Sequence, residues 1–287
     1  MSDASSPPAA PRDSQRPNAA DSTPLPEAPA AAVAVAEDLQ TPWNGMDLVV
    51  FGVFALAMLM LLTNLLAAVA VERFGVPADR IAQFSTTNAG FIISRQVLWF
   101  LCILLYLFAL LRRRSARTFW RALGWRGLQH GLVAAPLLAL ILLLVGCAMA
   151  IAANAASEFY TTPKPLPIEA LFADRRSVLY LMAYGLLLAP LAEETVFRGF
   201  FYPVLARRFG IFAGIAATGI LFGMVHVPQL WGGWAQIATL VAVGMALTAV
   251  RAGLHSVAAS YLLHLGYNGF LFGGFWFATG ALQHLPK

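Results

Sequence analysis

From Met46 onward the chain is dominated by apolar runs of about 20 residues, and this feature most restricts the folds it can adopt. A helix needs about 20 residues to cross a hydrocarbon core of about 30 Å. Lipid offers the backbone no hydrogen-bonding partner, so such runs form helices. The expected spans are 46–71, 89–111, 131–155, 178–207, 211–227, 232–250 and 254–280. We therefore predict an all-α, polytopic integral membrane protein with about seven transmembrane helices, between six and eight.

The composition supports this class. The chain is 59% hydrophobic and 11% charged, whereas a soluble domain carries about 25% charged residues. These values exclude an ordinary cytosolic globule, a disordered protein and a nucleic-acid binder. The only cysteines, Cys102 and Cys147, lie inside apolar runs, so neither a disulfide framework nor a cysteine metal site is expected.

The two ends of the chain differ from its middle. Residues 1–43 hold eight of the 17 prolines and almost no large apolar residue, which predicts a disordered tail. This tail lacks a basic start followed by an apolar core, so it is not expected to be a cleavable signal peptide. N-terminal transmembrane helices are expected over 44–177, and residues 281–287 form a short C-terminal tail.

The distribution of arginine predicts the orientation. Residues 112–130 carry six arginines and no acid, and the turns near 207–210 and 251–253 are also basic, whereas the alternate connections are balanced or uncharged. The basic turns and the N-terminal tail should therefore be cytoplasmic. Segment 115–130, with Trp120 and Trp125, predicts a helix lying in the membrane interface. The Ala- and Arg-rich composition with only two lysines favours a bacterial inner membrane.

Beyond Asp174 the only acids are Glu193 and Glu194, which lie inside an apolar run. A carboxylate inside a membrane helix costs about 3 kcal/mol on insertion scales, so the pair calls for an explanation. Arg198 follows Glu194 by four residues and therefore shares its helix face. Glu193 points about 100° away from that face. We expect Glu194 and Arg198 to form a structural pair and Glu193 to be free for chemistry.

Further polar residues are expected at the same depth. His226 ends an apolar run one turn after Phe222, and His264 and Asn268 are spaced to project together from the last span. At 1.5 Å per residue, Glu193 and His226 lie roughly 21–23 Å from the cytoplasmic side, and the last two roughly 16–23 Å. Three antiparallel helices can thus bring a carboxylate, two imidazoles and an amide to one level.

This set of groups predicts hydrolysis of an amide or ester. A carboxylate and an imidazole can hold and deprotonate a water molecule, while a second histidine and an asparagine amide can donate to an oxyanion. Alternatively, Glu193, His226 and His264 could be ligands of a catalytic divalent metal such as zinc. The residues leave both mechanisms open. The sequence contains no HExxH motif, no GxGD motif in a span and no GxSxG nucleophile elbow.

At these positions the sequence resembles a known family. The motifs are Glu193-Glu194-x-x-x-Arg198, Phe222-x-x-x-His226 and His264-x-x-x-Asn268. They match, in order, the three motifs of the CPBP intramembrane proteases, which are the CAAX-protease and bacteriocin-processing (Abi-type) family. The resemblance covers about 178–280 and implies a four-helix catalytic core with a membrane-embedded cavity.

The resemblance also implies roles and partners. Glu193 and His226 would activate water for peptide-bond hydrolysis, His264 and Asn268 would stabilise the oxyanion, and the remaining motif residues, Glu194, Arg198 and Phe222, would support them. The family has also been described as metal-dependent, which keeps a divalent metal open. The implied substrate is a membrane protein or peptide in the lipid bilayer, since some members cleave prenylated CAAX proteins and others are linked to bacteriocin immunity.

Two other classes of function stay open on the residues alone. A non-catalytic immunity protein could use the polar cavity to bind a peptide. A proton-coupled transporter could relay protons through Glu193 and the histidines. An internal repeat would favour the transporter, and the sequence shows none.

Overall fold

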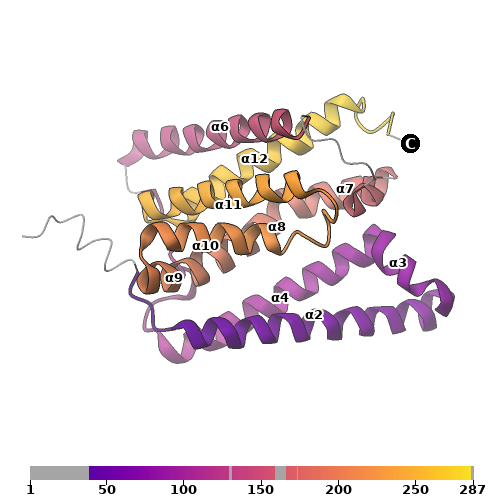
Figure 1. Ribbon diagram of the computed structural model, residues 1–287, viewed down its shortest axis with the longest axis horizontal. Coiled ribbons are helices and arrows are strands. Elements are labelled where there is room, and N and C mark those ends of the chain that lie inside the picture. The colour runs from indigo at the N-terminus through magenta and orange to yellow at the C-terminus, as the bar shows by residue number, and fades with distance from the viewer. Residues whose placement is uncertain (1–38, 129–130, 159–165, 173, 286–287) are drawn as a thin grey trace, which may run out of the picture.

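The computed structural model describes residues 39–128, 131–158, 166–172 and 174–285 (Figure 1). Within these ranges the chain is built from helices and contains no strand, which confirms the predicted all-α class. The predicted tail over 1–38 and the last two residues, 286–287, lie outside the described residues.

Seven helical segments coincide with the seven predicted spans. They are α2 (Gly45–Phe74), α4 (Ala89–Arg114), α6 (Gly131–Glu158), one continuous rod, α10 (Ile211–Met224), α11 (Trp234–Leu254) and α12 (Val257–Ala278). The rod consists of α7 (Arg175–Ala183), η3 (Tyr184–Leu188), α8 (Ala189–Glu194), η4 (Thr195–Phe201) and α9 (Tyr202–Phe209). The short connecting helices are η1 (Ala78–Arg80), α3 (Ile81–Thr87), α5 (Phe119–Ala122) and η2 (Pro167–Phe172).

Among the described residues, five helices are long and apolar enough to cross a membrane. They are α2, α4, Val133–Ala156 of α6, the rod over Arg175–Phe209, and α11. α12 has 22 residues but is not among these five. α10 has only 14 residues, and at 1.5 Å per residue it covers about 21 Å, so it ends before crossing the hydrocarbon. The chain is thus a polytopic membrane protein in which one of the seven segments is too short to span.

The helices pack side by side with close backbone contacts. α6 lies along α12, and α10 lies between α9 and α11 (Figure 1). A Cβ atom at Gly146 of α6 would lie 2.1 Å from the carbonyl oxygen of Leu263, and one at Gly266 of α12 would lie 2.1 Å from that of Leu143. Small residues at a crossing let two membrane helices approach this closely, so these two glycines fix the contact between α6 and α12.

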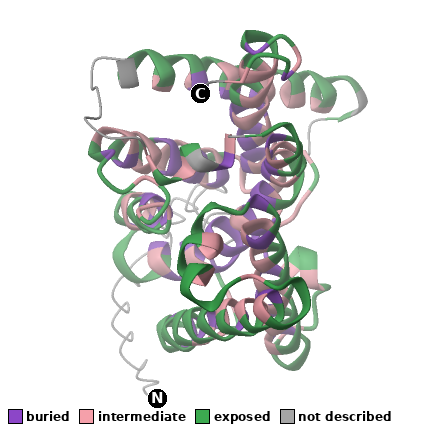
Figure 2. Ribbon diagram, turned by 90° about the vertical axis from the view of Figure 1, so that its right-hand side faces the viewer, coloured by how far each residue is buried: buried purple, intermediate pink, exposed green. Residues whose placement is uncertain are grey.

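The outer faces of the helices are largely exposed (Figure 2), and many of the exposed residues are large and apolar. They include Val53, Leu56, Met60 and Leu61 of α2, Leu101 and Leu105 of α4, and Leu137, Leu140 and Leu144 of α6. A soluble monomer rarely exposes continuous apolar surface of this extent. These faces are therefore the surface that contacts lipid.

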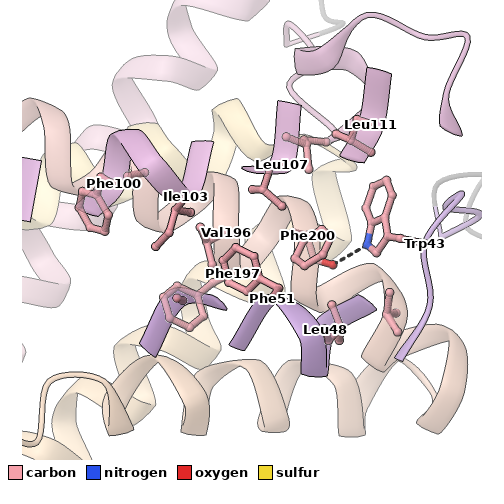
Figure 3. Packing of buried hydrophobic residues seen from close by; sticks show 14 of the residues in the cluster. Trp43, Leu48, Phe51, Phe100, Ile103, Leu107, Leu111, Val196, Phe197 and Phe200 are labelled. Atoms are coloured by element: carbon pink, nitrogen blue, oxygen red, sulfur yellow. Dashed lines mark hydrogen bonds between the residues drawn. The ribbon is translucent and has the colours of Figure 1, made fainter. Parts of the chain in front are cut away.

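The largest apolar cluster joins the segment before α2 to the rod (Figure 3). Trp43 is 1% exposed, stacks on Phe200 with ring centroids 5.4 Å apart, and donates from its indole nitrogen to the Phe200 carbonyl at 2.9 Å. Arg207 donates to the carbonyl oxygens of Leu39, Thr41 and Trp43. The sequence assigns residues 39–43 to the tail, but in the structure they pack against the rod.

Segment 115–128 holds a single helical turn, α5, instead of the helix expected along its length. Gly124 ends this turn with a φ of 79°, a conformation that favours glycine. Trp125 then donates from its indole nitrogen to the hydroxyl of Thr195 at 3.1 Å. Trp125 therefore anchors this connection to the rod, while Trp120 is exposed.

Candidate active site

The two glutamates lie in a short α-helical piece between two wider turns of the rod. η3 and η4 are π-helical, and each ends two residues before a proline, Pro190 and Pro203. A proline inside a helix has no N–H and its ring clashes with the carbonyl four residues earlier, so the helix must adjust there. π-Helical turns are rare and recur at functional sites. The prolines thus account for the irregular backbone around Glu193 and Glu194.

Glu194 is fully buried at the centre of a polar network. Its Oε1 accepts from Arg198 Nη1 at 3.0 Å and lies 2.9 Å from His264 Nδ1, and its Oε2 accepts from the Ser260 hydroxyl. The expected contact between Glu194 and Arg198 is therefore present. The contacts with Ser260 and His264 were not predicted from sequence. Ser260 lies one helical turn before His264, and this spacing is the signal that could have indicated it.

Arg198 is also fully buried and satisfied by a neighbouring helix. Its Nη2 donates to the Gly244 carbonyl of α11 at 2.8 Å and its Nε to the Thr248 hydroxyl at 3.3 Å. Its guanidinium carbon lies 4.5 Å from the centre of the Phe222 ring, within the range of a cation–π contact. A buried ion pair is tolerated when further hydrogen bonds satisfy both partners, as they do here.

Glu193 lies between the two histidines. Its Oε1 is 4.0 Å from Nε2 of His226, and its Oε2 is 3.9 Å from Nε2 of His264. These separations are too long for direct hydrogen bonds. The side chain of Glu193 is 15% exposed, against 0% for Glu194. The adjacent glutamates thus face different surroundings, one in the protein interior and one at a cavity.

His226 follows the end of α10 instead of lying within a span. α10 ends at Met224, and His226 lies in the turn that follows. Its Nδ1 is 2.7 Å from the carbonyl oxygen of Phe222. A carbonyl can only accept, so Nδ1 carries the proton, and in the neutral ring Nε2 presents a lone pair toward Glu193. The short helix therefore positions His226 at the depth of Glu193.

The surroundings of His264 fix its proton in a similar way. Glu194 accepts hydrogen bonds from Arg198 and Ser260, and a proton on Nδ1 of His264 lets the same carboxyl group accept a third. The side chain of His264 is only 5% exposed. It is therefore a buried neighbour of Glu193 with its Nε2 directed toward that carboxylate.

Asn268 is brought to the same cavity but contacts a different group. Its side-chain amide donates to the carbonyl oxygen of Gly185 in η3 at 2.8 Å. An amide nitrogen has two hydrogens, so one remains for another acceptor. The structure thus brings the three predicted motifs together around one cavity.

The cavity has a volume of about 460 Å³ and lies beside Glu193, His226 and Asn268. α4, α6, η2, the rod, the turn after α10, α11 and α12 all contribute to its wall. Its apolar lining includes Leu181, Leu230, Leu240, Leu271, Phe272 and Phe275. Predominantly apolar walls with a few convergent polar groups are typical of a binding site for an organic molecule or peptide.

No group of three or more histidine, cysteine, aspartate or glutamate side chains is placed to hold a metal ion within the described ranges. Glu193, His226 and His264, the alternative metal ligands, therefore do not meet as a ligand set in this arrangement. The chemical steps below are accordingly derived for the side chains and water.

Residues 175–270 match the family model of the Rce1-like proteins, described as type II CAAX prenyl endopeptidases. No curated protein and no solved structure gives a significant match. The matched range contains all three motifs, from Glu193 to Asn268, and confirms the resemblance to the CPBP and CAAX protease family.

Proposed function

We propose that this chain, whose residues 175–270 match the family model of the Rce1-like CAAX prenyl endopeptidases, is an intramembrane endopeptidase. It would hydrolyse a peptide bond of a membrane-associated protein or peptide. The observation that carries this proposal is the position of the Glu193 carboxylate, 4.0 Å and 3.9 Å from two imidazole Nε2 atoms beside an apolar cavity. A water molecule between Glu193 and His226 can donate one hydrogen bond to each.

The first step is the attack of this water on the substrate. Glu193 accepts a proton from the water, and His226 holds the remaining O–H through its unprotonated Nε2. The oxygen then forms a bond with the carbonyl carbon of the scissile peptide, whose oxygen takes the negative charge. The Phe222 carbonyl keeps the His226 ring in the tautomer that this step needs.

His264 and Asn268 would stabilise the oxyanion. Asn268 has one amide hydrogen left after its bond to Gly185. His264 can donate from Nε2 only when both of its nitrogens carry protons, and its Nδ1 is held by Glu194. Donors held in place before the reaction contribute about 3–4 kcal/mol each in comparable sites.

In the second step the tetrahedral intermediate breaks down. Glu193 returns its proton to the amide nitrogen, the carbon–nitrogen bond breaks, and an amine and a carboxylic acid are released. Glu194, Arg198 and Phe222 do not touch the reacting atoms in this scheme. They hold His264 and the neighbouring Glu193 in position.

The proposed protease is an integral protein of a bacterial inner membrane. The arginine-rich ends of α4 and α9 favour a cytoplasmic side that also carries the N-terminus, in a bacterial inner membrane. The cavity, between helices with lipid-facing surfaces, suits a substrate segment that arrives through the bilayer. The proposal names no requirement for a prenyl group.

The testing experiment compares wild type with Glu193→Gln in lipid nanodiscs against a library of membrane-spanning peptides, with cleavage followed by mass spectrometry. Wild type should cleave at least one peptide, and the variant should lose at least 100-fold in rate while its melting temperature is unchanged. Full cleavage by the variant would refute the mechanism. A phenotype in cells that survives Glu193→Gln, His226→Ala and His264→Ala would support a non-catalytic binding function instead.

A further inference from the structure

The cavity carries uncharged amide side chains that the proposed hydrolysis does not use. Beyond Asn268, its lining includes Gln96 of α4, Asn154 of α6, Gln229 in the turn after α10, and Gln236 of α11. An amide can both donate and accept hydrogen bonds, which is what a peptide main chain requires of its partner.

Gln236 is the most informative of these residues. Its Oε1 is buried and has no hydrogen-bond partner among the described residues. A Cβ atom at Gly233 would lie 2.8 Å from this oxygen, so the glycine leaves the room that the amide occupies. An unsatisfied buried acceptor destabilises the folded protein. Gln236 lines the cavity, so a rotation of its side chain would bring this unpaired oxygen to a ligand N–H.

Gln229 lies on the same wall, close to the proposed chemistry. Its backbone is fixed at both ends, because its N–H donates to the carbonyl of His226 at 3.0 Å and its carbonyl accepts from Ile168 of η2 at 3.1 Å. Its side chain is exposed. The turn that positions His226 thus also presents a polar amide three residues further along the chain.

The chemistry of the substrate explains the need for such groups. A peptide segment in lipid is helical because its N–H and C=O groups must be paired internally. A peptide bond open to attack has lost this pairing, and the freed groups need new partners within the protein. Apolar walls with interspersed amides suit an unwound main chain that carries uncharged side chains.

We propose that Gln236 and Gln229 form a main-chain subsite that binds an unwound, uncharged segment of the substrate beside the scissile bond. The location of that bond rests on the proposed function. The subsite itself requires only that the cavity holds a peptide. It would select substrates by the ease with which a membrane helix unwinds locally.

The test measures binding in the Glu193→Gln protein in nanodiscs of phosphatidylethanolamine and phosphatidylglycerol. One probe is a fluorescent 25-residue Leu/Ala peptide with a central Gly-Ser-Gly-Asn break, and the other has the same length without the break. Adding Gln236→Leu should raise the Kd of the broken peptide about tenfold, and Gln229→Ala several-fold. The Kd of the unbroken peptide should change less than twofold. The melting temperature of Gln236→Leu should be equal or higher, because an unpaired buried acceptor has been removed.

Gln83→Leu is the matched control, since Gln83 is exposed on α3 and does not line the cavity. Unchanged affinity of Gln236→Leu for the broken peptide would overturn the subsite, as would a protein that binds neither probe. A lower melting temperature would assign Gln236 a structural role and overturn it too. Because the test measures binding to an inactive variant, a wild type that cleaves nothing would refute the protease proposal while leaving this result intact.

Discussion

The side-chain amide of Asn268 in α12 donates to the carbonyl oxygen of Gly185 in the π-helical turn η3 at 2.8 Å. Ala189, whose N–H would serve Gly185 in an α-helix, donates to Tyr184 instead. Pro190, the next residue, has no N–H to donate. The proline and the π-helical turn thus remove the usual helical donors of this carbonyl, and an asparagine of α12 binds it.

Pro190→Ala should disturb this arrangement. The alanine N–H can reach the Gly185 carbonyl and compete with Asn268, whose amide then loses its fixed position. We expect kcat to fall about tenfold, equivalent to about 1.4 kcal/mol, with no loss of thermal stability. Peptide cleavage and melting in detergent measure the two quantities. Pro136→Ala, in the interior of α6, is the control proline. An unchanged kcat for Pro190→Ala would contradict the coupling.

Glu194→Gln and Glu193→Gln should have different effects, because Glu194 stabilises the fold and Glu193 is proposed to act in catalysis. The first change leaves Arg198 fully buried without a carboxylate partner, and breaking a buried pair in this way costs about 3–5 kcal/mol. We expect a large fall in melting temperature and in the yield of folded protein. The second change removes a carboxylate at a cavity wall and should leave the melting temperature unchanged. Equal stabilities of the two variants would refute the division between the glutamates.

The sequence predicted the helices because length and hydropathy decide what can cross lipid. It also predicted that Glu194 meets Arg198, since i,i+4 neighbours share a helix face. The contacts of Glu194 with Ser260 and His264 join residues 66 and 70 positions apart. They depend on the crossing of α12 with the rod, which local periodicity does not contain.

The π-helical turn before Pro190 and the burial of Trp43 could not be predicted from the helix pattern of the sequence. A pattern of 3.6 residues per turn does not predict where a π-helical turn occurs. The sequence therefore did not predict the wider turn η3 before Pro190. Trp43 follows a proline-rich stretch whose composition predicts disorder. Its burial depends on a complementary surface around Phe200 that only the folded protein provides.

Metal dependence can be tested directly on the purified protein. Glu193, His226 and His264 do not meet as a ligand set in the described structure, so we expect full activity after dialysis against EDTA and 1,10-phenanthroline. Elemental analysis should find zinc far below one equivalent per chain, because a structural or catalytic site would hold a whole ion. Loss of activity that returns with one equivalent of zinc would favour the metal-dependent alternative.

The segment before α2 should stabilise the protein through Trp43. Its ring fills a site beside Phe200 and is 1% exposed, so Trp43→Ala leaves a cavity and should cost about 3–5 kcal/mol. Trp43→Phe keeps an aromatic ring and loses only the hydrogen bond to the Phe200 carbonyl, which should cost about 1 kcal/mol. Denaturation in mixed micelles compares the two. Because the same aromatic cluster packs against η4, Trp43→Ala should also lower the rate of peptide cleavage. A Trp43→Ala protein as stable as wild type would show that residues 39–43 contribute nothing to holding the rod.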